Sequence, residues 1–207
     1  NTKWYDPENA ICISVGPVGG NTNYPGSGKS IVTSLSPITN IPIDSNVGGH
    51  FGPYAPLSVV ENIYKSNLFM DTTKKGYAFK FINVYPRPFF NHLRKKPKRL
   101  NVTAHCMLSS AIPFNKSREV YDKQALTPEI TNYRWRGKLG SKVPEISPEE
   151  AGKRFLRIMR KNDLSVFEYY LTDYAGHRRY DGKIEEICEI LDRFLFYIMK
   201  NFDFEND

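Results

Sequence analysis

The last third of the chain decides the fold, and its central stretch, residues 147–171, reads SPEEAGKRFLRIMRKNDLSVFEYYL. Ser147 is a typical helix N-cap, Pro148 suits the first helical position, and Glu150 stands where a capping box requires an acidic side chain. The pattern predicts a helix that starts at Ser147 and ends near 161–163. A strand is then expected over 164–171.

A long amphipathic helix is predicted after this strand, from Gly182 to about Phe202. Its apolar residues recur at the i, i+3, i+4, i+7 spacing of a helix that faces a core. They are Ile184, Ile187, Cys188, Leu191, Phe194, Leu195 and Ile198. The order helix, strand, helix predicts an α/β fold in which helices cover both faces of a mostly parallel sheet.

The preceding part of the chain has weaker signals. Between a first short strand and the first predicted helix, residues 21–56 are rich in Gly, Pro, Ser, Thr and Asn, which predicts a long loop. The predicted elements are strands at 10–15 and 77–84, helices at 59–70, 89–93 and 101–111, and a polar linker at 113–146.

Composition favours one compact globular unit of 207 residues, with 40% apolar residues. The net charge of +7 attracts anions, and the basic run at 94–99 is either a nucleic-acid patch or, as we favour, a solvated loop. Three widely spaced cysteines predict neither a disulfide framework nor a zinc ribbon. With no long apolar stretch, we expect a cytoplasmic protein without membrane contact.

A carboxylate and an imidazole follow the predicted strand at 164–171, in the sequence TDYAGH at 172–177. Asp173 and His177 stand at the carboxyl end of that strand, where ligands bind in open α/β sheets. One hypothesis is that both side chains bind a divalent ion. The alternative is an aspartate that caps the next segment beside a surface histidine.

This motif and its surroundings resemble a metalloenzyme family of the alkaline phosphatase superfamily, whose relatives include cofactor-independent phosphoglycerate mutase and phosphopentomutase. The resemblance runs through FEYYLTDYAGH at 167–177 and the helix that follows. Upstream it includes GHFGPY at 49–54, NVYP at 83–86 and SPEEAG at 147–152. It covers roughly residues 48–202.

The resemblance implies an alkaline-phosphatase-like sandwich, incomplete, with a cap-like inserted segment. It divides the chain into a loop-rich N-terminal segment with the first strand at 1–47, a cap-like inserted region at 48–146, and an α-β-α core segment at 147–207.

The resemblance also implies roles for individual residues. Asp173 and His177 would bind a divalent metal, Mn, Zn or Mg, as one ion of a two-metal site. Ser27, in PGSGKS at 25–30, takes the position of the nucleophile. The implied substrate-binding residues are His50, Arg94 and Lys95.

Two departures from the family pattern weigh against activity. The sequence GPVG at 16–19 stands where the family has a metal-binding aspartate. The chain also ends at Asp207, where a later strand with an Asp-His-Gly pattern is expected. The second metal therefore has no visible protein ligand apart from Ser27.

Three functions follow as hypotheses, and the sequence leaves open whether the protein is an active enzyme. The first is divalent-metal-dependent phosphoryl transfer, as a phosphatase or phosphomutase-like domain acting on a phosphate monoester. The second is a catalytically incomplete relative that serves as a binding or assembly protein, and the third is a basic nucleic-acid-binding module. The expected partners are a phosphorylated small molecule and a second chain or copy that completes the fold, whereas nucleic acid is not expected.

Single residues also leave alternatives open. Ser27 is either a nucleophile or part of a flexible Gly-Ser turn, and a P-loop is disfavoured because Asn23 stands where that motif has glycine. His105 is either a site residue or, as we favour, an ordinary helix histidine. Trp135 either clamps a ligand with its neighbouring arginines or anchors the linker to the core.

Overall fold

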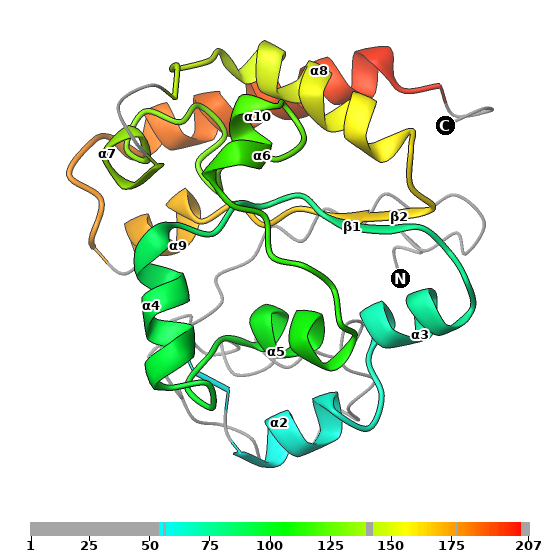
Figure 1. Ribbon diagram of the computed structural model, residues 1–207. Helices are drawn as coiled ribbons and strands as arrows, with labels where there is room; N and C mark the ends of the chain where they lie inside the picture. Colours follow the sequence, from blue (N-terminus) through cyan, green and yellow to red (C-terminus); the bar gives the residue numbers. More distant parts are fainter. Residues whose placement is uncertain (1–53, 56, 140–142, 177, 204–207) are drawn as a thin grey trace, which may run out of the picture.

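The computed structural model describes residues 54–55, 57–139, 143–176 and 178–203 (Figure 1). This part of the chain is mostly helical around a sheet of two short strands. The elements in chain order are α2 (Leu57–Ile63), α3 (Leu68–Lys74), β1 (Phe79–Phe81), α4 (Arg87–Lys95), α5 (Val102–Ser109), α6 (Ser117–Tyr121), α7 (Arg136–Leu139), α8 (Pro148–Met159), β2 (Leu164–Val166), α9 (Leu171–Gly176) and α10 (Ile184–Asn201).

The sheet consists of β1 and β2, which lie side by side in parallel, with Phe79 opposite Leu164 and Phe81 opposite Val166. The sequence predicted both strands in these places but made them longer, at 77–84 and 164–171. They are short because the backbone beyond Val166 pairs with a side chain rather than with the neighbouring strand.

That side chain is Asn83. Its Nδ2 donates to the carbonyl oxygen of Glu168 and its Oδ1 accepts from the Glu168 N–H, both at 2.7 Å. On the other side of the chain, isolated parallel bridges join Asn83 to Leu126 and Val84 to Asn115. Segments far apart in the sequence therefore meet at the carboxyl ends of β1 and β2.

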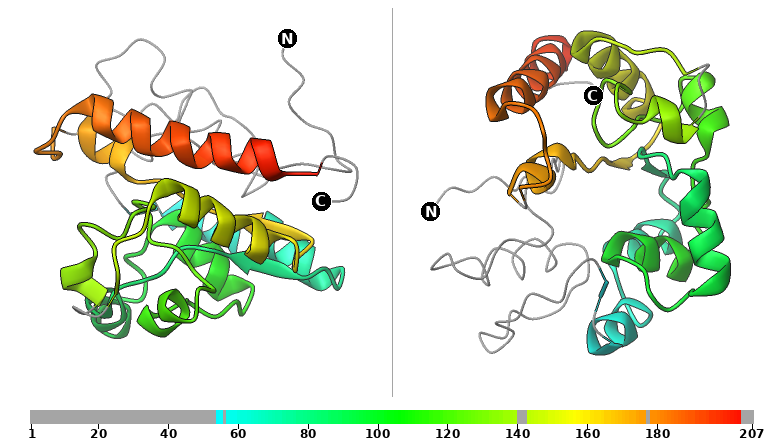
Figure 2. Two further views of the ribbon diagram at one scale, coloured as in Figure 1. Left: turned by 90° about the horizontal axis from the view of Figure 1, so that it is seen from above. Right: turned by 90° about the vertical axis from the view of Figure 1, so that its left-hand side faces the viewer.

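Helices lie on both sides of the strand pair (Figure 1). On one side, α8 and α10 run next to each other in the same direction (Figure 2). On the other side lie α2, α3 and α5. Each side has its own apolar cluster, one built around Phe155, Phe167 and Phe194, the other around Phe69 and Phe81.

Close packing of α8 against α10 depends on Gly152. A Cβ atom at this position would lie 2.9 Å from Cδ1 of Tyr197 and 3.2 Å from its Cβ. Real Cβ contacts are essentially never that short, so glycine lets the backbone of α8 approach the Tyr197 side chain of α10. The two helices also carry an edge-to-face pair, Phe155 with Phe194, whose ring centroids are 5.7 Å apart.

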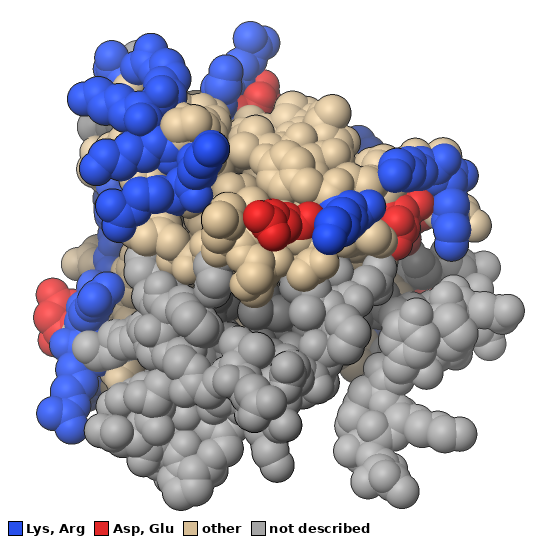
Figure 3. Space-filling view, turned by 90° about the horizontal axis from the view of Figure 1, so that it is seen from below, with Lys and Arg blue, Asp and Glu red and all other residues tan. Residues whose placement is uncertain are grey.

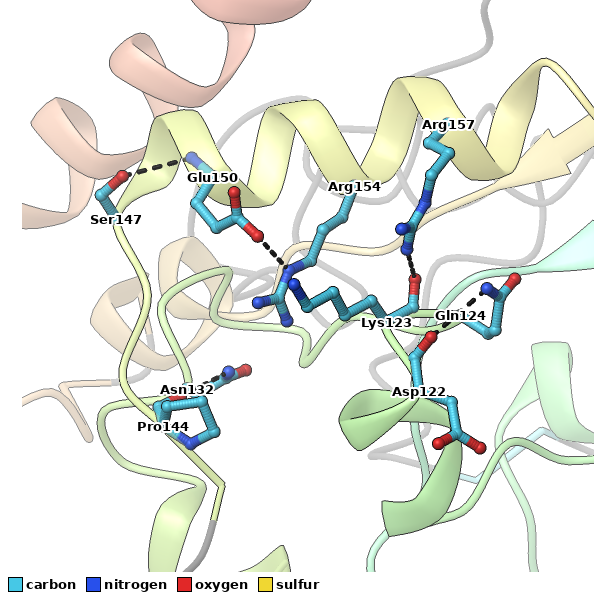
Figure 4. A network of polar contacts seen from close by, with 9 residues as sticks. All are labelled: Asp122, Lys123, Gln124, Asn132, Pro144, Ser147, Glu150, Arg154 and Arg157. Carbon is cyan, nitrogen blue, oxygen red and sulfur yellow. Dashed lines mark hydrogen bonds and ion pairs between the residues drawn. The ribbon is translucent and has the colours of Figure 1, made fainter.

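The predicted start of α8 is confirmed (Figure 4). The Ser147 hydroxyl oxygen accepts from the Glu150 N–H at 3.2 Å, and Pro148 occupies the first turn. One turn later, Arg154 donates to the Glu150 carboxylate at 2.8 Å. Because the Arg154 side chain is buried, this ion pair keeps its charge compensated inside the fold. The long helix predicted at 182–202 is confirmed as α10.

One predicted helix is wrong in outline, because residues 59–70 do not form a single helix. The chain leaves α2 at Ile63 and starts α3 at Leu68. Asn67 causes the break: its Oδ1 accepts from the Met70 N–H at 3.0 Å as an N-cap, while its Nδ2 donates to the Ile63 carbonyl oxygen at 2.8 Å. The same side chain therefore closes one helix and opens the next.

The predicted polar linker at 113–146 contains two short helices, α6 and α7, and its own small apolar cluster. Trp135 is buried in this cluster with Val84, Val120 and Val143. The interpretation of Trp135 as an anchor is thus confirmed. Ile82, Leu126 and Ile130 pack in the same cluster as α8 and α10, so the expected segments 48–146 and 147–207 share one core.

The protein is a mixed α/β fold with a small parallel sheet, as the sequence predicted in coarse terms. An alkaline-phosphatase-like sandwich is not shown, because the described part of the chain has a sheet of two strands only. The expected segment at 1–47 lies outside the described residues. Among the helices that the structure describes, none is both long enough and apolar enough to cross a membrane.

Candidate ligand site at the carboxyl end of the strand pair

The residues that the sequence singled out do not come together in one described site. Ser27, His50 and His177 lie outside the described residues. Asp173 lies in the first turn of α9, in a helix rather than in the turn that the sequence suggested. Its pairing with His177 at a metal stays a prediction.

The two basic site residues lie in and near a surface hollow on α4. Arg94 lines this hollow together with Phe90 and Lys116, whereas Lys95 is exposed at the end of the helix. Residues 94–99 are exposed throughout, and the expected solvated loop is found at 96–99, whereas Arg94 and Lys95 form the end of α4. His105 is buried in α5, and burial lowers the pKa of its imidazole.

Another cavity lies at the carboxyl ends of β1 and β2, which point toward α4 and α9 in Figure 1. We call it the Arg99 pocket, and its volume is about 370 Å³. Such a position is where ligands bind in parallel α/β sheets. The lining residues used below are Tyr54, Asn83, Tyr85, Phe89, His92, Arg99, Asn101, Trp135 and Tyr170.

Three side chains form a stack along one wall of this pocket. The Arg99 guanidinium lies over the Tyr54 ring, with its Cζ 4.7 Å from the ring centroid. Tyr54 and His92 are parallel, with centroids 5.9 Å apart. The His92 Nε2 is 2.7 Å from the Arg99 carbonyl oxygen, which requires a donating Nε2–H. The stack places a cation beside flat rings at the edge of the cavity.

Polar groups occupy the wall nearest the strands. The Tyr170 hydroxyl donates to the Glu168 carboxylate at 2.7 Å, and the Thr103 hydroxyl binds the other carboxylate oxygen. The Asn101 Nδ2 lies 3.5 Å from the Tyr170 hydroxyl oxygen. Tyr170 therefore links the pocket to a carboxyl group behind it.

The environment of Glu168 favours its neutral form. Removal from water raises the pKa of Glu168, and the hydroxyl groups of Thr103 and Tyr170 oppose this effect only in part. Burial and the nearby Glu168 carboxylate in turn raise the pKa of Tyr170 well above its ordinary value. Burial thus disfavours the charged form of both groups.

The sequence missed most of this site, although it contained part of the signal. The stretches NVYP at 83–86 and FEYYLTDYAGH at 167–177 hold Asn83, Glu168 and Tyr170, but no role was assigned to these three residues. Arg99 was noted only as the end of a basic run. Tyr54 ends the stretch GHFGPY at 49–54, but nothing local in the sequence places it beside Arg99.

Comparison with known proteins gives one match. A family model for the N-terminal domain of aldehyde ferredoxin oxidoreductase matches residues 1–63. The match covers less than a third of the chain. Of the matched residues, the structure describes Tyr54, Ala55 and 57–63. No curated protein and no solved structure matches the chain.

This match corrects the family expectation. The family model that matches residues 1–63 describes a domain of an oxidoreductase, so the assignment to the alkaline phosphatase superfamily is wrong. The prediction of phosphoryl transfer on a phosphate monoester, as a phosphatase or phosphomutase, rested on that assignment and is also wrong. The local likeness misled because short motifs such as Asp-x-x-x-His recur by chance, and here the aspartate belongs to a helix.

The cofactor expectation of Mn, Zn or Mg is corrected on the same ground. Within the described ranges, no group of three or more His, Cys, Asp or Glu side chains is arranged to hold a metal ion. These residues therefore do not provide the ligand set that such an ion requires.

Proposed function

We propose that the protein binds a small organic molecule that combines a flat ring with a negatively charged group, and that it does so in the Arg99 pocket. The observation that carries this proposal is the stack of Arg99, Tyr54 and His92 at the edge of an apolar cavity. A ligand pocket of this kind is mostly apolar, with a few polar groups that fix orientation.

The ring of the ligand is assigned to the aromatic walls. The cavity is lined by Tyr85, Phe89, Trp135 and Tyr170, and aromatic pairs in offset or edge-to-face contact stabilise a bound ring. The volume of about 370 Å³ suits a molecule with one or two rings.

The negative group of the ligand is assigned to Arg99. Among the described residues, no carboxylate forms an ion pair with its guanidinium, whose contact is the Tyr54 ring. An arginine on an aromatic face keeps its planar donors available, and it binds carboxylate or phosphate through two parallel hydrogen bonds. A phosphorylated small molecule, as expected from the sequence, is one ligand class that fits.

The test is a calorimetric titration with an aromatic carboxylate, a nucleoside monophosphate and a neutral ring of the same size. We expect the charged rings to bind and Arg99→Gln to weaken them by about tenfold or more, because a charge-assisted hydrogen bond is lost. Lys98→Gln is the matched control, since it removes the neighbouring charge, which does not line the pocket. Equal weakening by both variants, or equal affinity for the neutral ring, would overturn the proposal.

A second candidate function is the oxidation of an aldehyde with ferredoxin as electron acceptor. The family-model match at residues 1–63 favours it, and Tyr54 of the matched segment lines the Arg99 pocket. Conversion of an aldehyde and water into a carboxylate releases two electrons and three protons. When the aldehyde carries an aromatic ring, the product belongs to the class of ligand proposed above.

The described residues provide no ligand set for a metal or cluster, so no step of this oxidation is assigned to them. Aldehyde-dependent reduction of a viologen dye by the purified chain tests this candidate. Reduction with several aldehydes would support it, and an unchanged dye with every aldehyde would exclude it for this chain. Neither result bears on the binding of carboxylates in the Arg99 pocket, which the calorimetric titration tests.

The location that we propose is a reducing compartment, the cytoplasm. The support is the spacing of the three cysteines. Of these, Cys106 is buried and Cys188 is exposed, and both are free thiols.

A further inference from the structure

A second cavity lies behind the Arg99 pocket and shares three wall residues with it, Pro128, Trp135 and Tyr170. We call it the Arg134 pocket, and its volume is about 350 Å³. The rest of its lining is Glu129, Arg134, Lys138, Leu171, Tyr174 and Arg179. Neither the family match nor the proposed function assigns a role to it.

The Arg134 pocket is held in place by a tightly constrained loop. Ile130 and Asn132 have positive φ angles of 73° and 67°, which a β-branched residue such as Ile130 rarely adopts. The Thr127 hydroxyl donates to the Asn132 side chain, which in turn donates to the Pro144 carbonyl oxygen at 2.9 Å. These buried bonds stabilise the strained backbone from which Arg134 projects.

Three cationic side chains line this cavity, from two separate parts of the chain. Arg134 and Lys138 come from the loop and from α7, and the Lys138 Nζ lies 5.2 Å from the centroid of the Trp135 ring. Arg179 follows α9, and its backbone N–H donates to the Tyr174 carbonyl oxygen at 2.8 Å. The positive charges therefore converge on one space rather than spreading along one helix.

The negative charges nearby do not balance these cations. Asp181 pairs with Arg134, whose guanidinium also lies over the Tyr180 ring. The carboxylate of Glu129 accepts from the Trp135 N–H at 2.8 Å, and burial raises its pKa. Among the described residues, neither Lys138 nor Arg179 forms an ion pair. An excess of positive charge thus faces the cavity.

We propose that the Arg134 pocket is a binding site for a compact, doubly charged tetrahedral oxyanion, that is, a phosphate or sulfate group. Lys138 and Arg179 bind its oxygens, and Arg134 adds a third cation. An anion of this size fits easily into about 350 Å³ and leaves room for bridging water. The proposal is independent of the ligand in the Arg99 pocket.

The test is a titration with sodium sulfate at low ionic strength, followed by calorimetry. Sulfate keeps its charge across the neutral pH range, so protonation of the ion does not complicate the result. We expect saturable binding that weakens by about threefold or more in Lys138→Gln and in Arg179→Gln, and by about tenfold or more in the double variant. Thermal unfolding of each variant checks that the fold is intact.

The chain offers matched controls next to both residues. Arg136→Gln and Arg178→Gln remove the same charge from neighbours that do not line the cavity, and we expect sulfate affinity to stay within about twofold. Equal weakening in these controls would overturn the proposal in favour of a diffuse positive field. The absence of saturable binding would also overturn it.

Two further experiments extend this test. One distinguishes a phosphate ester from free phosphate as the ligand, and the other distinguishes the Arg134 pocket from the Arg99 pocket. Methyl phosphate that binds as tightly as inorganic phosphate would support an ester as the ligand, and preference for inorganic phosphate would support the free ion. Arg99→Gln should leave sulfate binding unchanged, because Arg99 does not line the Arg134 pocket. Loss of sulfate binding in Arg99→Gln would contradict two separate sites.

Discussion

At the scale of single residues, the most informative side chain is Asn83. Its amide forms the two hydrogen bonds that the backbone of a neighbouring strand would otherwise form. It supplies the donor and the acceptor that Glu168 needs beyond the end of β2, and it is buried. A buried polar group that loses its partner costs more than the net gain of making the bond. The carboxyl edge of the sheet, where the Arg99 pocket lies, therefore depends on this one amide.

Asn83→Ala is expected to lower the free energy of unfolding by about 2–4 kcal/mol, because two backbone groups of Glu168 lose their partners. Urea denaturation measures the change. Asn91→Ala is the control: it removes an exposed asparagine whose Oδ1 accepts from Arg94 at 2.6 Å, and it should change stability by less than about 0.5 kcal/mol. Similar losses in both variants would show that the Asn83 bridge is not what holds the edge of the sheet.

Glu168 gives a prediction about pH. Its pKa is raised from 4.5 by loss of hydration, so the folded state binds the proton more tightly than the unfolded chain does. The stability that this group contributes is full below pH 4.5 and is lost as the pH rises through the folded pKa. Glu168→Gln should therefore become more stable relative to the natural protein as the pH increases from 4.5 toward neutrality.

Urea denaturation of both proteins between pH 4 and 8 measures this difference. All other titrating groups are common to the two proteins, so the difference isolates Glu168. A difference in stability that stays constant over this range would contradict a raised pKa for Glu168.

At the scale of elements, the packing of α8 on α10 rests on Gly152. Gly152→Ala is expected to destabilise the protein by about 1–3 kcal/mol, because the added Cβ meets the Tyr197 side chain at 2.9 Å and the helices must separate. The better helix propensity of alanine, about 1 kcal/mol, offsets part of this cost.

Gly137→Ala in α7 is the matched control, since a Cβ there meets nothing within 4 Å. It should leave the protein as stable as before or slightly more stable. Thermal unfolding compares the two variants. If Gly152→Ala is as harmless as Gly137→Ala, the contact between the two helices is not the close one described above.

Elements with strong end signals were predicted well from sequence. The capping box at Ser147 and the apolar stripe of α10 are local patterns, and both helices begin and end close to where these patterns placed them. The lengths of β1 and β2 and the break at Asn67 were not predictable in this way. Both depend on what an asparagine side chain meets in three dimensions, and Asn67 even bonds to Ser109 of α5 at 3.0 Å.

At the scale of the whole molecule, the sequence predicted the coarse α/β arrangement but not the cavities. An α/β order and a parallel strand pair follow from hydrophobic patterns, which the fold repeats on both sides of the sheet. The Arg99 pocket takes residues from five separate regions of the chain, at 54, 83–101, 128, 135 and 170. No pattern of sequence spacing connects these regions. The sequence therefore indicated the local motif around Asp173 instead.

The distribution of positive charge over the molecule is more informative than the net charge. Figure 3 shows a large group of Lys and Arg side chains at the left of this face and a smaller group at its right. Such a distribution steers anions toward these parts of the surface. The Arg99 and Arg134 pockets, which share Pro128, Trp135 and Tyr170, are cavities lined with cations near the carboxyl ends of the strand pair.

The central claim is that Arg99 recognises the negative group of a ring-shaped ligand, and a thermodynamic cycle tests it most directly. Affinities of an aromatic carboxylate and of its neutral amide would be measured by calorimetry for the natural protein and for Arg99→Gln. We predict that removing both charges costs less than the sum of the two separate losses, with a coupling energy of about 1 kcal/mol or more. Losses that simply add, with no coupling between Arg99 and the ligand's charge, would contradict the claim.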